Sequence, residues 1–462
     1  MGTTKTIVAK FRDFEFGPNP GQIEKRLSPD DLDMLRKLSP GCGLQSLYRK
    51  FTSGDIAEMV KRALSSDPAY RDPKLLTYFR LNCPGGGSLE PIVEKLRSMK
   101  DIEHAYIAPA VVDTTVNFDR NPRTPYQGYL EPAPRGVDAK YASLVEGGDG
   151  KGQEFIDLEQ GWTLEHEDLV DHGAQLLYGE IVDASRPHGT RVLGVICAVD
   201  NAKGGVGIVP HLGSVNVVSH TGDAANIAEA ITFAAERLSR NGIGGVLLLE
   251  TSLRWSDNWI LPVETDPAIF AAIELAVGQG VVVIEAAGNG GRPLDERPDL
   301  NGKMILNRNS EDFRDSGAIM VGSALRTGEP RIWTRALDSN FGSRIDCFAS
   351  GDSVDTTDSG AVNGGTTTDY THAFNGTSSA AAIIAGTALS VQGMAQASRG
   401  ARLTPEELRQ ILSDRTPGTP ERPANTPTAA PQTDLVGVMP NLKAISAIAL
   451  QIQIADILAI PV

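Results

Sequence analysis

Four short stretches of the chain carry side chains that could act on a carbonyl carbon. The most informative is 374–386, which reads FNGTSSAAAIIAG. It places Ser378 at the start of a run of small and apolar residues, which predicts a buried helix. Ser378 could then present its hydroxyl to a cleft, and its own N–H, an unpaired donor of the first turn, could bind an oxyanion. A plain helix N-cap is the alternative role for a serine in this setting.

A histidine with the properties of a general base occurs earlier in the chain. His188 precedes Gly189 and Thr190 and the apolar run at 192–196, so it is expected at the mouth of a helix. The positive end of the helix dipole disfavours an imidazolium there, which keeps the ring neutral and able to accept a proton.

An acid and an amide follow two apolar runs. Asp157 ends the run EFID, where a carboxylate at the exit of a buried strand could accept a hydrogen bond from an imidazole. Asn289 follows VVVIEAAG, and an Asn side chain is a neutral donor suited to a developing negative oxygen. Both positions also suit ordinary turn chemistry.

The surrounding pattern predicts the elements that must position these side chains. From residue 150 onwards short apolar runs alternate with amphipathic segments, which is typical of parallel βαβ units and predicts a doubly wound, mostly parallel α/β sheet. In such a sheet a site forms at the carboxyl ends of the strands. We expect strands at 154–156, 213–218, 246–249, 281–286 and 318–321, and crossover helices at 226–238 and 267–277.

The order Asp157, His188, Asn289 and Ser378 resembles that of the subtilisin-like serine peptidase (subtilase) family. The resemblance rests on HGT at 188–190, AGN at 287–289, GTS at 376–378 and the stretch 340–352, and it spans about residues 137–416. It implies a subtilisin-like fold and a serine endopeptidase acting on polypeptides. The implied roles are nucleophile for Ser378, general base for His188, orienting carboxylate for Asp157 and oxyanion donor for Asn289.

The resemblance also implies a substrate-binding edge. The residues implied there are Ser252, Leu253, Arg254, Ala287 and Gly288. At two positions the sequence departs from the family pattern. Arg254 occupies a position usually given to glycine, which predicts a narrower or charged cleft. The family usually has a glycine two places after its aspartate, whereas Leu158 and Glu159 follow Asp157. A catalytically silent binding module with the same fold is therefore a second hypothesis.

Residues 1–112 predict a small α+β domain of ferredoxin-like type. Strands are expected at 7–11, 75–81 and 102–108, with helices at 30–38 and 88–99. The part from residue 78 to 108 resembles the family's propeptide, which implies a domain that assists folding and inhibits the cleft. A zymogen held inactive by this domain is a third hypothesis, and an unrelated α+β module is the alternative.

Three further segments complete the predicted organisation. The proline-rich stretch 113–136 is expected to be an exposed linker and a site of self-cleavage. Residues 417–434 form a Pro/Thr-rich connector. The apolar segment 435–462 is interrupted by polar residues, so a docking helix or edge element is expected and a membrane span is not.

Composition excludes several other functions for the 462-residue chain. A formal net charge of −15 gives no electrostatic basis for binding nucleic acid. The four cysteines lack CxxC spacing, so no metal site is assigned; no cofactor is required, and calcium is possible without an assignable ligand set. The first sixteen residues lack the apolar core of a signal peptide, which predicts a cytoplasmic protein or release by a non-classical route.

Overall fold

The structure is a computed structural model that divides into two compact units, Met1–Thr114 and Thr115–Val462. It describes residues 5–12, 28–38, 43–48, 50–67, 69–83, 89–108, 115–240, 244–299, 301–328, 332–360, 365–420 and 436–451.

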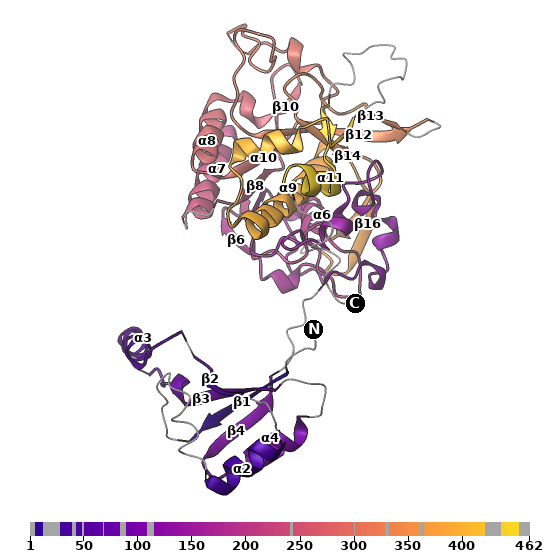
Figure 1. Ribbon diagram of the computed structural model, residues 1–462. Helices are drawn as coiled ribbons and strands as arrows, with labels where there is room; N and C mark the ends of the chain where they lie inside the picture. The colour runs from indigo at the N-terminus through magenta and orange to yellow at the C-terminus, as the bar shows by residue number, and fades with distance from the viewer. Residues whose placement is uncertain are drawn as a thin grey trace. The chain divides into compact units, whose positions relative to one another are not determined.

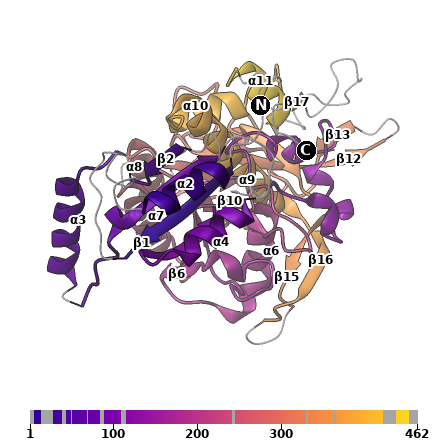
Figure 2. The ribbon, with the colours of Figure 1, turned by 60° about the horizontal axis from the view of Figure 1, so that its bottom comes forward.

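The first unit is built on an antiparallel sheet whose described strands follow the order β2-β3-β1-β4. Helices lie between β1 and β2, between β2 and β3, and between β3 and β4, so the unit is the predicted ferredoxin-like βαββαβ arrangement with one added helix, α3. Helices α2 and α4 lie side by side over the sheet, and α3 stands apart from them (Figure 1, Figure 2). The elements are β1 (Lys5–Phe11), α2 (Pro29–Leu38), β2 (Gly43–Ser46), α3 (Ser53–Ser66), η1 (Leu75–Thr77), β3 (Tyr78–Cys83), α4 (Glu90–Ser98) and β4 (Ile102–Ile107).

The apolar residues of α4, the last helix of this unit, form part of its core. Ile92, Val93 and Leu96 of α4 are buried against Phe79 and Ile102 of the sheet. Helix α3 was not predicted, although its Ile56, Met59, Val60 and Leu64 are spaced three and four apart; Ile56 is its one buried residue, and Met59 and Leu64 are exposed.

The second unit contains one large sheet of ten described strands, and its central strands are parallel. Its path is β17-β18-β14-β12-β11-β8-β5-β7-β6, with β13 paired to β12. All five strands predicted from the sequence are present and are central. The strands are β5 (Glu154–Glu159), β6 (Gln175–Tyr178), β7 (Ser214–Ser219), β8 (Val246–Leu249), β11 (Val282–Ala286), β12 (Ile319–Thr327), β13 (Ile332–Arg335), β14 (Cys347–Ser350), β17 (Thr419–Pro420) and β18 (Val438–Met439).

Helices cover both faces of this sheet, which makes the unit a doubly wound α/β fold (Figure 1). One face is covered by α7 (Ala224–Ser239) and α8 (Pro267–Gly278), and the other by α6 (Arg186–Cys197) and α9 (Gly376–Arg399). Two small antiparallel pairs lie outside the sheet: β9 (Ser252–Arg254) with β10 (Ile260–Pro262), and β15 (Val354–Asp358) with β16 (Asp369–Phe374).

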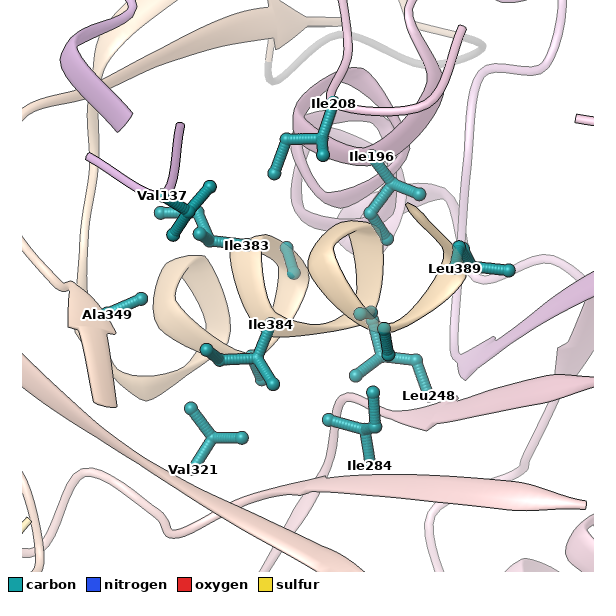
Figure 3. Packing of buried hydrophobic residues seen from close by; sticks show 14 of the residues in the cluster. Val137, Ile196, Ile208, Leu248, Ile284, Val321, Ala349, Ile383, Ile384 and Leu389 are labelled. Carbon is teal, nitrogen blue, oxygen red and sulfur yellow. The ribbon is translucent and has the colours of Figure 1, made fainter. Parts of the chain in front are cut away.

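Helix α9 is the centre of the larger core. Its Ile383 and Ile384 lie between Ile196 and Ile208 on one side and sheet residues such as Leu248 on the other (Figure 3). By length and composition α9 could cross a membrane, but 94% of its apolar window is buried inside the protein. Its small residues permit very close approach: a Cβ at Gly393 would lie 2.0 Å from the carbonyl oxygen of Gly147.

The sequence predicts an exposed linker at 113–136, and from residue 115 onwards this prediction is wrong, because the segment is folded into the second unit. It carries η2 (Phe118–Arg120), η3 (Thr124–Tyr126) and η4 (Gly128–Leu130) and is packed on the second unit. The Arg123 guanidinium donates to both oxygens of the buried Asp355, and Gln127 exchanges two hydrogen bonds with the backbone of Val206. Prolines interrupt helices and strands, but they do not prevent side chains from packing. Here side-chain contacts hold the proline-rich segment against the rest of the second unit. Residues 113 and 114 lie outside the described part.

The C-terminal segment docks on the same unit. Strand β18 pairs with β14, and α11 (Leu442–Ile448) contacts α9 and α5 (Ala139–Ala142), with Leu442 and Ile445 fully buried. Helix α10 (Pro405–Leu412) also packs on α9. The prediction gave a docking helix or an edge element; α11 is a docking helix, whereas β18 lies between β14 and β17 and is not the edge strand. Most of the connector at 417–434 lies outside the described residues.

Candidate active site

The site lies where the central strands end. Parallel pairing sets Glu159 beside Ser219, and Leu158 beside Leu249. The residues that follow these strands therefore share one edge of the sheet, at which α6 and α9 begin.

A carboxylate and an imidazole form the closest functional pair at this edge. His188 lies in the first turn of α6, and its Nδ1 is 2.8 Å from Glu159 Oε2. When Nδ1 carries the proton and donates it to Glu159, the Nε2 lone pair is free to accept a proton. The ring also meets Phe374 edge to face at a centroid distance of 5.6 Å, which holds it beside the segment leading into α9.

Asp157 does not lie behind the histidine, which corrects the sequence-based expectation. Its Oδ2 accepts the indole N–H of Trp162 at 2.7 Å, and the residue is fully buried. Asp157 and Glu159 are two residues apart on β5 and so point to the same face of the sheet, with Glu159 nearer the strand end. The sequence-based prediction therefore named Asp157, whereas Glu159 on the same face is the acid that contacts His188.

The two acids form a coupled pair. Burial raises the pKa of Glu159 well above its ordinary value, although a hydrogen bond with Asp157 opposes the rise. Burial, and next the charge of Glu159, raise the pKa of Asp157. Asp157 Oδ1 and Glu159 Oε1 are both buried without a conventional partner among the described residues. One proton shared between these oxygens would satisfy both, and Glu159 would remain the ionised member that faces His188.

Ser378 occupies the predicted position in the first turn of α9. The helix begins at Gly376 after the N-cap Asn375, and Ser378 is half-buried, whereas Ser379 is fully buried and turned away. The Ser379 hydroxyl donates to the carbonyl oxygens of Ser350 and Gly376. Among the hydrogen bonds between described residues, none joins Ser378 to His188. Both residues act on the ionisation of a third, Glu250, because the charge of His188 and the Ser378 hydroxyl each lower its pKa.

Asn289 lies against the start of α9, as an oxyanion donor must. Its Oδ1 accepts from the backbone N–H of Thr377 at 2.9 Å and from the Thr377 hydroxyl at 3.0 Å. This fixes the amide so that its NH2 group is the half left to donate. Gly376 has a φ of +84°, and a Cβ there would lie 2.9 Å from Asn289 Oδ1, so glycine is needed for both conformation and space.

Glu250 is a site residue that the sequence analysis missed. It directly follows β8 and is buried, and neither of its carboxyl oxygens has a conventional hydrogen-bond partner in the described chain. A carboxyl group in an apolar sequence context carries no periodic signal, so only the strand register reveals its place.

A family model decides the relationship of the chain to known proteins. The model of the subtilase family matches residues 159–435, which is more than half of the chain. The chain belongs to the subtilase family. This subtilase is 29% identical over 216 residues to subtilisin-like protease 1 of Pseudogymnoascus destructans, covering 46% of each chain. It is 26% identical over 314 residues to an alkaline protease of Alkalihalobacillus alcalophilus, covering 65% of this chain and 69% of that one.

The fold agrees with that of a solved protease. A structure from Pseudoalteromonas arctica aligns with this subtilase at a TM-score of 0.50 and 20% identity, covering 71% of this chain and 98% of that chain. The subtilase spans about half the length of the fungal relative named above. The comparisons therefore show the family and the fold of this chain.

The family pattern also explains the position of the acid in this subtilase. Counted from Glu159, the glycine expected two places later is present as Gly161, and the family match begins at Glu159. That spacing is the sequence signal that could have distinguished Glu159 from Asp157.

The predicted substrate-binding residues of the subtilase lie together. Ser252, Leu253 and Arg254 form β9, with Arg254 exposed, and β9 pairs with β10. Gly288 approaches this hairpin closely, because a Cβ there would lie 3.4 Å from Ser252 Oγ and 3.3 Å from the carbonyl oxygen of Ile260. The carbonyl oxygen of Ala287 accepts from Asn340 Nδ2 at 2.7 Å.

The described residues offer no group of three or more His, Cys, Asp and Glu side chains placed to hold a metal ion. Calcium therefore stays a prediction without a ligand set.

Proposed function

We propose that the chain is a serine endopeptidase with Ser378 as nucleophile, His188 as general base, Glu159 as orienting carboxylate and Asn289 as oxyanion donor. The observation that carries the proposal is the 2.8 Å contact between Glu159 and His188, beside the helix whose first turn carries Ser378. A histidine whose Nδ1 is held by a buried acid keeps Nε2 available for a serine proton.

The steps follow from this arrangement. His188 takes the proton of Ser378 as its oxygen attacks a peptide carbonyl, and Glu159 stabilises the imidazolium that forms. The oxyanion accepts from the Asn289 NH2 group and from the Ser378 N–H, which has no intrahelical acceptor in the first turn. The imidazolium returns its proton to the leaving amine, and water then hydrolyses the acyl-enzyme.

A fluorophosphonate probe tests the proposal, because it labels only an activated serine. Labelling is expected in the wild type and in Ser379→Ala, and it should vanish in Ser378→Ala. Ser379 is the matched control, since it is the adjacent hydroxyl in the same turn and its bonds face away from the site. A wild type that stays unlabelled at every pH, even after limited proteolysis has removed the first unit, would instead favour the silent binding module.

We also propose that the first unit inhibits the second and assists its folding. Its ferredoxin-like sheet and its compactness support this role. Self-cleavage is expected before Thr115, because the segment that follows is held by ion pairs such as Arg120–Asp200 and Arg123–Asp355. Labelling before and after limited proteolysis, with mass spectrometry of the products, tests both points: inhibition predicts that labelling rises once the first unit is removed.

A further inference from the structure

Glu250 occupies a position at which its ionisation would affect the reacting serine. Strand register sets Leu248 beside Asp157 and Leu249 beside Leu158, so Glu250 is the next residue along, level with Glu159 on the neighbouring strand. Leu248 packs in the core around α9, whereas Leu249 packs on the opposite face. Because side chains alternate, Glu250 points to the face of Leu248, towards α6 and α9.

The surroundings of this carboxyl group supply few compensating interactions. Its exposed fraction is 7%, and neither Oε1 nor Oε2 has a hydrogen-bond partner of normal geometry among the described residues. A buried carboxylate without partners is strongly disfavoured, and protonation is the simplest relief.

We propose that Glu250 is a positioning residue for Ser378, whose protonated carboxyl donates a hydrogen bond to Ser378 Oγ. The inference rests on the proposed function and deepens it by adding a control on the nucleophile. With Oγ accepting from Glu250, the Ser378 proton is directed at His188 Nε2.

The ionised form would act in the opposite direction. A Glu250 carboxylate is only an acceptor, so it would draw the Ser378 proton towards itself and away from His188. Its negative charge beside the nucleophile would also oppose the oxyanion. The serine is therefore competent while Glu250 keeps its proton and becomes misdirected once the proton is lost.

The direction of the pKa shift agrees with this arrangement. Burial is the largest effect and raises the pKa of Glu250 well above its ordinary value. The charge of His188 on α6 lowers it, the charges of Glu159 and Asp157 on β5 raise it, and the Ser378 hydroxyl on α9 lowers it. The neighbour on β11, Ala286, is uncharged. Activity is therefore expected to fall as pH rises through the raised pKa of Glu250.

The test compares the pH dependence of kcat/KM in Glu250→Gln and the wild type, with fluorophosphonate labelling rates as a second readout. Glutamine keeps a donor and cannot ionise. We expect the wild type to lose about tenfold in kcat/KM per pH unit on its alkaline limb, and Glu250→Gln to keep the plateau without that limb. Glu285→Gln is the matched control: Glu285 is another buried carboxyl with a raised pKa, on β11 and facing Glu264 on the other side of the sheet. Its alkaline limb should match that of the wild type.

Glu250→Leu covers the case in which the glutamine variant does not fold. Leucine removes both ionisation and the donor, so the limb should vanish and the plateau should fall about tenfold, as expected for one lost hydrogen bond. An alkaline limb that persists in whichever variant folds would overturn the role of Glu250 while leaving the proposed peptidase standing. A wild type that no fluorophosphonate labels at any pH, either intact or after limited proteolysis has removed the first unit, would overturn both.

Discussion

Glu159 Oε2 lies 2.8 Å from His188 Nδ1, and this contact is the basis for proposing Glu159 as the orienting acid. Asp157, one strand step earlier on the same face, is bonded to the Trp162 indole instead. The longer glutamate side chain starts at the strand end, where α6 begins, and so reaches the imidazole. The aspartate lies deeper, where its partner is a buried ring nitrogen.

Replacing Glu159 and Asp157 one at a time should lower kcat/KM by different amounts. Glu159→Gln is expected to lower kcat/KM about 10³ to 10⁴-fold, because the amide cannot hold the required tautomer or stabilise the imidazolium. Asp157→Asn should keep activity within about tenfold of the wild type, since its oxygen can accept from Trp162 and its NH2 can donate to Glu159 as a protonated aspartate would. Steady-state cleavage of a peptide substrate measures both. Equal losses of kcat/KM in the two variants would contradict the assignment of the orienting role to Glu159 and favour Asp157.

Removing the amide at Asn289 should slow the chemical step with little effect on binding. Asn289→Ala is expected to lower kcat about 10² to 10³-fold with a nearly unchanged KM, as for other oxyanion donors. Asn375→Ala is the matched control, because Asn375 lies next to α9 but its Oδ1 accepts only from the Ser353 N–H. A large KM effect in Asn289→Ala would indicate a ground-state contact and contradict the assignment.

A methyl group at Gly376 should damage stability and activity together. Gly376→Ala forces a positive φ on alanine and crowds Asn289, so the free energy of unfolding should fall by about 1–3 kcal/mol. Gly278→Ala, at the end of α8, has open space around its new methyl group and should leave stability unchanged or raise it by up to about 1 kcal/mol. Chemical denaturation and peptide cleavage test the pair, and equal stability of the two variants would contradict the packing argument.

Stability should depend on the ionisation of Glu250. Its folded-state pKa is raised above that of the unfolded chain, so the native state binds more protons between the two values. The wild type should therefore lose stability as pH rises from the ordinary carboxyl range towards the raised pKa. Glu250→Gln should lose less, with an advantage of about 1–3 kcal/mol near neutral pH. Denaturation midpoints measured across this range would contradict the prediction if both proteins changed in parallel.

The sequence predicts the central sheet well for a physical reason. Strand β8 is a continuous apolar run, and β5 and β11 are mostly buried strands in which acids interrupt the apolar residues; buried, largely apolar runs of this kind mark parallel strands. Ser378, His188 and Asn289 could be named because each lies directly at the junction of such a run with a turn or helix.

The remaining features depend on contacts between distant segments. The choice between Asp157 and Glu159 depends on which reaches α6, and Glu250 acquires its role only from its register with β5. Residues 115–136 read as a linker because their prolines are visible in the sequence, whereas their ion pair with Asp355 is not. Helix α3 has an apolar stripe that the prediction overlooked, and most of that stripe is not buried.

A close contact between Gly393 of α9 and Gly147 fixes the position of the helix that carries the nucleophile. Gly393 meets Gly147 backbone to backbone, and Ser378 lies about 22 Å along the axis at 1.5 Å per residue. Because a helix moves as a rigid unit, a methyl group added at residue 147 or 393 would displace α9. Ser378 would then shift relative to the His188 ring. Screens for inactive variants should accordingly recover changes at this remote contact as well as around the reacting groups.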